Sequence, residues 1–152
     1  MSRNADIEMT CNAGNTALHW AALKGNHTIC EILIRNGANI GAKNSLDQTH
    51  LQCAAMHVHL NATKVLISHQ ADVNALDSLR QSPLHWAVLH EEDCERFIEL
   101  LLKHQANVEV KNELGLTPAR IADARRYVVY RFLPAHNLAE ELAREIVALI
   151  GG

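Results

Sequence analysis

The chain has little excess charge, few aromatic residues and no long apolar run. Its 152 residues include 14 Lys and Arg against 17 Asp and Glu, a formal net charge of -3. A nucleic-acid-binding protein normally carries a basic face that displaces counterions, so we expect no nucleic-acid partner. No stretch approaches the roughly 18 apolar residues of a spanning helix, and the first residues lack the apolar core of a signal peptide. We therefore expect no membrane partner.

The sequence also lacks the usual marks of an enzyme. There is no glycine-rich phosphate loop, no CxxC pair, and no nucleophile-and-base arrangement placed by a motif. We therefore predict no catalysis and no cofactor. Three of the four cysteines, Cys30, Cys53 and Cys94, fall in helical patterns that favour a small apolar residue. Buried thiols in a reducing compartment are the better interpretation, which predicts the cytoplasm, with the nucleus as an alternative.

Ten histidines raise the possibility of a metal site. The densest group is His57 and His59, with His50 and Cys53 nearby in the sequence. Zinc needs four ligands that converge tetrahedrally, and these spacings fit no known finger. We interpret these histidines as solvated turn residues and predict no metal site.

What the chain does contain is an internal repeat. The pattern Thr16-Ala17-Leu18-His19-Trp20-Ala21 returns in related form from Thr49, Ser82 and Thr117, in steps of 33, 33 and 35 residues. A second pattern, Ala-Asp/Asn-Ile/Val, begins at residues 5, 38, 71 and 106 and has the same steps. A fixed period indicates one supersecondary unit stacked on copies of itself. Such a stack is usually a surface that holds a partner.

One repeat predicts two short helices and a projecting arm. Thr16 is a helix N-cap, and Gly25 ends the first helix with a residue that accepts positive φ. A second helix follows until Gly37. Residues 38–43 then run outward, and residues 44–48 form the return turn. Neither helix is long enough to be stable alone, so stacking must stabilise both.

This pattern resembles the ankyrin repeat family, with its TPLHxA-type core and GADVNA-type hairpin, over roughly residues 4–123. The resemblance implies an all-α solenoid of stacked helix-turn-helix units with β-hairpin fingers. It also implies a concave groove that binds other proteins and is rarely catalytic. His19 and His85 would then be structural, bonding the helix cap and the neighbouring turn.

Several positions depart from the family pattern. Gln52 and Arg120 replace the structural histidine; we expect Gln52 to keep some hydrogen bonds and Arg120 to expose its end. Val58 stands where Gly25 stood, and a β-branched residue at positive φ costs about 1 kcal/mol or more. We therefore predict that the turn at Val58 is rebuilt or that its helix continues. Gln70 and Gln105 likewise stand where Gly37 stood.

We predict a single domain over residues 1–152. Its parts are the tail of an incomplete repeat (4–10), full repeats (11–43, 44–76 and 77–111), a degenerate repeat (112–133) and a C-terminal capping helix (134–152). The last helix is either a cap or an element that docks on a partner. Without a capping repeat, the first helices would expose apolar surface, which is a liability or an interface. We expect a monomer, with dimerisation through either end as the alternative.

In the family geometry, a partner would contact the finger tips and the ends of the inner helices. These positions are Leu23, Lys24, Ser45, Leu46, Gln48, Met56, His57, Ser78, Leu79, Gln81, Leu89, His90, Leu114, Leu116 and Arg125. Two apolar rows stand out, Leu46, Leu79 and Leu114 on the fingers and Leu23, Met56 and Leu89 on the helices. Aligned apolar residues indicate a binding stripe. The alternative is that the finger leucines pack on one another for stability.

The sequence therefore predicts a non-catalytic module that binds another protein as adaptor or inhibitor. A secreted pathogen effector acting through the same surface is the alternative. Trp20 and Trp86 are expected to be core residues with one edge exposed. The resemblance also makes Asn74 a modification candidate, because it matches the hairpin asparagine that a 2-oxoglutarate-dependent hydroxylase modifies in this family.

Overall fold

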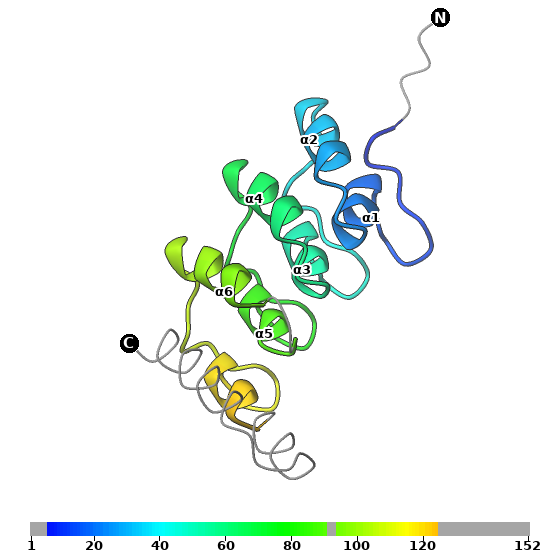
Figure 1. Cartoon of the computed structure of the whole chain (residues 1–152). Helices are drawn as coiled ribbons and strands as arrows, with labels where there is room; N and C mark the ends of the chain where they lie inside the picture. The colour runs from blue at the N-terminus through cyan, green and yellow to red at the C-terminus, as the bar shows by residue number, and fades with distance from the viewer. Residues whose placement is uncertain (1–5, 91–93, 125–152) are drawn as a thin grey trace, which may run out of the picture.

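The computed structural model describes residues 6–90 and 94–124, and within them three helix pairs follow one another. The pairs are α1 (Ala17–Leu23) with α2 (His27–Arg35), α3 (His50–Ala55) with α4 (Leu60–Ser68), and α5 (Pro83–Ala87) with α6 (Cys94–Lys103). A further helix begins at residue 118 and continues to residue 124, where the description ends. Figure 1 shows the pairs stacked in two rows, with α1, α3 and α5 as inner helices and α2, α4 and α6 as outer helices.

Each inner helix begins at a hydroxyl N-cap. The side chains of Thr16, Thr49 and Ser82 accept a hydrogen bond from the backbone N–H three residues on. The side chain at that third position bonds back to the N–H of the cap, which completes a capping box. The inner helices have only 7, 6 and 5 residues, too few to be stable in isolation. Packing against α2, α4 and α6 and against the next inner helix must therefore stabilise them.

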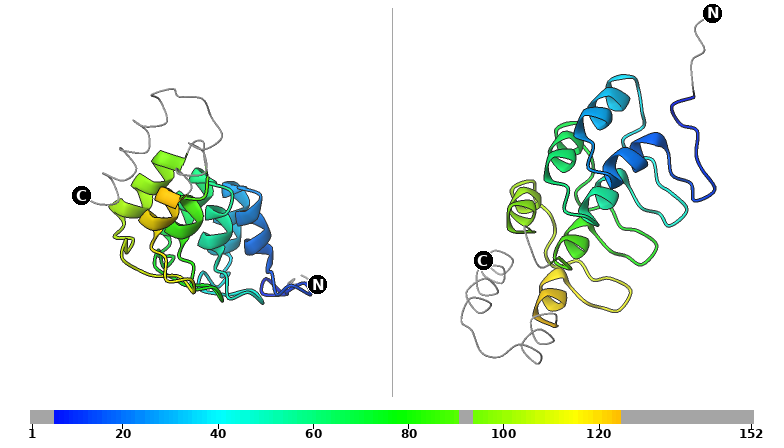
Figure 2. Two further views of the ribbon diagram at one scale, coloured as in Figure 1. Left: turned by 90° about the horizontal axis from the view of Figure 1, so that it is seen from below. Right: turned by 45° about the vertical axis from the view of Figure 1, so that its right-hand side comes forward.

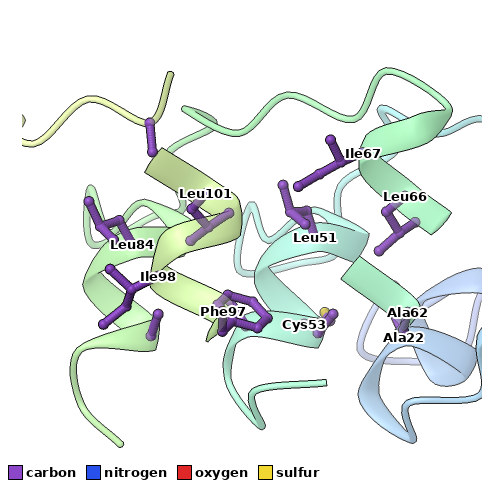
Figure 3. Packing of buried hydrophobic residues seen from close by; sticks show 14 of the residues in the cluster. Ala22, Leu51, Cys53, Ala62, Leu66, Ile67, Leu84, Phe97, Ile98 and Leu101 are labelled. Carbon is purple, nitrogen blue, oxygen red and sulfur yellow. The ribbon is translucent and has the colours of Figure 1, made fainter. Parts of the chain in front are cut away.

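The core lies between the two rows. The inner helices contribute small residues such as Ala22 and Ala55, both fully buried, and the outer helices contribute larger ones such as Leu66 and Phe97. Figure 3 shows residues of both rows in one buried cluster, with Ala22 and Cys53 from inner helices and Ala62 and Phe97 from outer helices. Small side chains on one helix pair thus leave room for the outer helix of the next. The predicted stack of helix pairs is confirmed.

The cysteines of the helices lie in this core, as expected. Cys30 and Cys53 are free thiols with no exposed surface, and Cys94 is also buried. Burial raises the pKa of Cys30 to about 11 and that of Cys53 to about 12. Both thiols are therefore protonated and unreactive at neutral pH.

The prediction for Val58 is wrong. Val58 adopts φ 54°, in the left-handed region, as Gly25 does with φ 68°. Val58 donates its N–H to the Ala55 carbonyl at 3.2 Å and His59 donates to Ala54 at 3.0 Å, as Gly25 and Asn26 do in the first pair. The paired helices thus fix the turn, and its bonds outweigh the strain of a β-branched residue. Gln70 and Gln105, at φ 67° and 64°, keep the left-handed position of Gly37 in the same way.

Hairpin-like fingers connect one helix pair to the next. Their tips are residues 11–15, 44–48, 77–81 and 112–116, each closed by a hydrogen bond from its first N–H to its last carbonyl. Figure 2 shows the fingers projecting to the same side of the stack. In the described ranges the only β-bridge joins Lys43 and Thr49, so the fingers are hairpin loops without regular strands. The predicted capping helix, residues 134–152, lies outside the described residues.

Candidate partner-binding surface

Each of the last three fingers is anchored by the inner helix that precedes it. The anchoring side chains donate to the last carbonyl of the next tip: His19 Nε2 to Gln48 at 3.1 Å, Gln52 Nε2 to Gln81 at 2.6 Å, and His85 Nε2 to Leu116 at 3.0 Å. At their other ends these side chains accept from the N-cap N–H of their own helix. The structural role of His19 and His85 is confirmed, and Gln52 performs it with amide atoms. Arg120 is exposed, as expected.

The finger tips are also bonded to one another. Ser45 donates its N–H to the Ala13 carbonyl, Ser78 to Leu46, and Glu113 to Leu79, all at 3.0–3.1 Å. Inside each of the last three tips, the side-chain oxygen of Asn44, Asp77 or Asn112 accepts from the N–H groups two and four residues on. This hydrogen bonding sets the tips side by side in a fixed order.

The leucine at the centre of each of the last three tips is exposed. Leu46 is 57% exposed, Leu79 51% and Leu114 80%. These leucines therefore do not bury one another, although their backbones are joined tip to tip. We call Leu46, Leu79 and Leu114 the leucine row.

The second apolar row, at the ends of the inner helices, is less exposed. Leu23 and Met56 are half-buried, whereas Leu89 is 44% exposed. The Met56 sulfur lies 3.5 Å from the Gln48 amide nitrogen, which donates to it. This contact places the end of α3 beside the base of the second finger, so the two rows belong to neighbouring parts of one surface.

Basic side chains gather at the same ends of the inner helices. Lys24, His57 and His90 occupy equivalent positions, in steps of 33 residues, and His59 lies beside them. His90 Nε2 donates to the Met56 carbonyl at 2.8 Å and His59 Nε2 to the Leu23 carbonyl at 2.9 Å, so both cap the preceding inner helix. Desolvation, followed by electrostatic repulsion from His59, His90 and Lys24, lowers the pKa of His57. His57 is therefore mostly neutral at neutral pH, and the residue is exposed.

The remaining predicted positions divide between surface and scaffold. Ser45 and Ser78 are exposed, whereas Gln48 is 7% exposed. Gln81 and Leu116 are half-buried, and their carbonyls anchor the fingers. Gln48 is thus a scaffold residue rather than a contact for a partner. Arg125 lies outside the described residues.

Trp20 is a further correction, because it is 48% exposed and not a core residue. Trp86, its counterpart, is half-buried and donates its Nε1–H to the Asp77 carboxylate at 3.0 Å. Ile29 and Ile32 of α2 are also exposed, at 41% and 50%. The sequence could have indicated the exposure of Trp20, Ile29 and Ile32, because all three lie in the first complete helix pair.

Asn74 lies in the arm before the third finger and is bonded to the next arm. Its amide nitrogen donates to the Gln105 carbonyl at 3.2 Å, and its oxygen accepts from the Asn107 N–H at 2.7 Å. The residue itself is exposed. Asn74 therefore joins two successive repeats through an amide at the surface.

No group of three or more His, Cys, Asp or Glu side chains in residues 6–90 and 94–124 is arranged to hold a metal ion. No helix in these ranges is long and apolar enough to cross a membrane.

Comparison with known proteins agrees with this geometry. Residues 36–112 match the family described as ankyrin repeats (3 copies), and residues 13–45 match the single ankyrin repeat. The palmitoyltransferases ZDHHC17 of Homo sapiens and of Danio rerio are each 48% identical to the chain over 40 residues, which is 26% of this chain. The matched segment covers only 6% of the length of these relatives. With its stacked helix pairs, anchored fingers and matched repeats, the chain belongs to the ankyrin repeat family.

Proposed function

We propose that this chain is a non-catalytic module that binds a partner protein through the surface shared by its finger tips and inner-helix ends. In this role it acts as an adaptor or an inhibitor. Ankyrin repeats are generally protein–protein interaction modules, which supports a protein as the partner. The proposal concerns this surface and not the one formed by the outer helices.

The exposed leucine row is the observation that carries the proposal. Three leucines at successive tips are each more than half exposed, and hydrogen bonds between the tips hold them in order. Aligned apolar side chains on a fixed backbone lose little conformational freedom on binding, so more of the burial free energy is available for affinity. Leu89 and the half-buried Met56 extend this apolar surface toward the inner helices.

The test compares two variants in which exposed apolar side chains are removed from different faces. The first variant carries Leu46→Ala, Leu79→Ala and Leu114→Ala, and the control carries Ile29→Ala and Ile32→Ala on α2. Proteins captured on the immobilised wild-type chain are identified by mass spectrometry, purified and titrated against each variant by calorimetry. We expect the leucine variant to bind at least tenfold more weakly, since a tenfold loss needs only about 1.4 kcal/mol.

Either of two results would contradict the proposal. One is unchanged affinity of the leucine variant. The other is a loss of affinity confined to the Ile29 and Ile32 control, which would move the binding site to α2. Thermal unfolding of both variants shows whether each remains folded, and both should, because the substituted side chains are largely exposed.

We also propose Asn74 as a site of asparagine hydroxylation, following the family resemblance of its hairpin. Its exposure supports access by a modifying enzyme. Its two bonds to the next arm require that arm to separate locally before the enzyme can hold the side chain. Intact mass of the chain isolated from its native source should show a species heavier by one oxygen, which Asn74→Ala removes. Absence of that species rejects the site.

A further inference from the structure

Each inner helix ends close to an apolar residue that is followed by a basic one. These pairs are Leu23-Lys24 after α1, Met56-His57 after α3 and Leu89-His90 after α5, in steps of 33 residues. Figure 1 shows α1, α3 and α5 one after another along the inner row, so the three helix ends lie in series. We call Lys24, His57 and His90 the basic row. The whole chain has a formal net charge of -3, so the basic row is a local feature.

Two histidines fix the backbone of the basic row. His59 donates its Nε2–H to the carbonyl directly before Lys24 at 2.9 Å, and His90 donates to the carbonyl directly before His57 at 2.8 Å. Lys24 and His57 themselves are exposed. Over residues 6–90 and 94–124, their side chains make no hydrogen bond or ion pair. Their donors are therefore available to a partner, on a backbone that the neighbouring repeat holds in place.

A positive charge on His57 is repelled by the bases around it. Desolvation is the largest cause of its lowered pKa, and electrostatic contributions from His59, His90 and Lys24 act in the same direction. The ring centroids of His57 and His59 are 5.7 Å apart. A carboxylate brought by a partner would offset this repulsion, so His57 would take up a proton on binding. The acidic residues at positions 91–93, which follow His90 in the sequence, lie outside the described residues.

We propose that the basic row binds an acidic segment of the partner protein, which lies extended across the inner-helix ends, and that this binding tightens as the pH falls. The inference rests on the proposed function and names the chemistry of its partner. Packed helices lie about 8–10 Å apart, and an extended chain advances about 3.3 Å per residue. The fitting segment therefore carries Asp or Glu at about every third residue. The apolar residue beside each base favours a peptide over a phosphate backbone.

The first experiment selects a peptide without assuming its sequence. A phage-displayed library of random dodecapeptides is selected on the immobilised full chain at pH 5.5. Asp and Glu titrate near pH 4, so the carboxylates of the peptides remain ionised. We expect the enriched peptides to contain more Asp and Glu than the unselected library, about three residues apart, together with apolar residues. Enrichment of peptides without acidic residues, or no enrichment at all, overturns the proposal.

Two variants that each lose one lysine and one histidine then locate the site. Lys24→Gln with His57→Gln removes two exposed members of the basic row, and the control, Lys103→Gln with His104→Gln, removes an exposed pair at the end of α6. An enriched acidic peptide is titrated against both by calorimetry. We expect about fivefold weaker binding by the first variant, because two exposed ion pairs are lost, and a change within about twofold in the control. An equal loss in both variants, or none in the first, contradicts the proposal.

The pH dependence has its own readout. The affinity for the acidic peptide should be about fivefold higher at pH 5.5 than at pH 7.5, because the protonated form of His57 binds a carboxylate better than the neutral form does. Calorimetry in two buffers of different ionisation enthalpy measures the protons taken up on binding, and His57→Gln should remove most of this uptake. Weaker binding at pH 5.5 by a chain that is still folded, or uptake that His57→Gln leaves unchanged, rejects the inference.

The variant with Leu46→Ala, Leu79→Ala and Leu114→Ala separates this inference from the proposed function. If acidic peptides lose affinity for the Lys24 and His57 variant only, the basic row is supported and the leucine row is rejected. If peptides without acidic residues are enriched and lose affinity for the leucine variant only, the proposed function stands and the basic row is rejected as the contact. A single-stranded DNA oligonucleotide that binds the wild type but not the Lys24 and His57 variant, with no acidic peptide enriched, assigns the row to a nucleic acid instead.

Discussion

The first and second helix pairs make the same hydrogen bonds with different residues. In the first pair His19 connects the N-cap Thr16 to the Gln48 carbonyl, and in the second pair Gln52 connects Thr49 to the Gln81 carbonyl. The imidazole offers an acceptor nitrogen on one side and a donor nitrogen on the other, and the carboxamide offers an acceptor oxygen and an NH₂ group that donates to the Gln81 and Ala75 carbonyls. What the stack requires at this position is therefore a bridge of that length, and not a histidine.

The junction between these two pairs differs from the next in its titratable groups. His19 and His50 are buried with their ring centroids 3.9 Å apart, and both contact the Thr16 hydroxyl. At the next junction the equivalent residues are Gln52 and Pro83, neither of which titrates. The two junctions thus share one geometry, but their stability should respond differently to acid.

Acid should destabilise the first junction, and His50→Pro should reduce the effect. Burial, followed by the charge of His19, lowers the pKa of His50 to about 4, and burial lowers that of His19. An unfolded histidine titrates near pH 6.5, so its stabilising contribution is complete above that pH and falls as the pH drops toward 4. The loss from His50 is about 3 kcal/mol at most. Urea unfolding between pH 7.5 and 4.5 measures it.

Proline is the matched replacement at position 50. Pro83 and Pro118 occupy this position in the later repeats, and Thr49 already has the extended conformation, φ -83° and ψ 166°, that a residue before proline needs. At pH 7.5 the free energy of unfolding of the variant should lie within about 1 kcal/mol of that of the wild type, because proline offsets the lost bond to the Ile40 carbonyl. Equal loss of stability in both proteins on acidification would show that His50 is not the source.

Removing the Gln52 side chain, which bridges Thr49 and the Gln81 carbonyl in the second pair, should have the next largest effect on stability. Gln52→Ala removes the side chain that bonds to the Thr49 N–H and the Ala75 carbonyl, in a position with no exposed surface, and leaves the Gln81 carbonyl with the Asp77 N–H alone. We expect a loss of about 2 kcal/mol in the free energy of unfolding, whereas Gln52→His should cost much less. Arg120→Ala, at the same position but exposed, should stay within about 0.5 kcal/mol. A loss with Gln52→His as large as with Gln52→Ala would mean that the bridge is not what matters.

The sequence predicted the parts of this molecule that depend on the spacing of its repeats. The helix pairs, the caps, the fingers and the structural histidines all follow from side chains that recur every 33 or 35 residues. It did not predict features that depend on a neighbouring repeat. Trp20 and Trp86 share the local sequence Leu-His-Trp-Ala, yet their exposure differs because different elements surround them. Gln48 appears at the base of a finger like any surface residue, and its burial depends on contacts with Asn44 and Met56.

We expect the smallest effect on stability at the turn between the paired helices, where the residues of two equivalent turns can be exchanged directly. Val58 and Gly25 occupy the same left-handed position, and Val58→Gly removes the strain of a β-branched residue at φ 54°. Part of that gain is lost with the half-buried valine side chain, so we expect the free energy of unfolding to rise by less than 1 kcal/mol. The reverse change, Gly25→Ala, should destabilise by about 1 kcal/mol or more, because an added Cβ would lie 2.5 Å from His59 Nδ1.

Thermal and urea unfolding of the two variants compare the turns directly. If Val58→Gly were clearly destabilising, the packing of the valine would outweigh its backbone strain. Its presence at a glycine position would then be a stabilising feature of the second pair. If Gly25→Ala were neutral, the His59 ring would have to move and give up its bond to the Leu23 carbonyl at little cost. The end of α1 would then need no cap from the next repeat, and the two helix pairs would be less tightly coupled than their hydrogen bonds indicate.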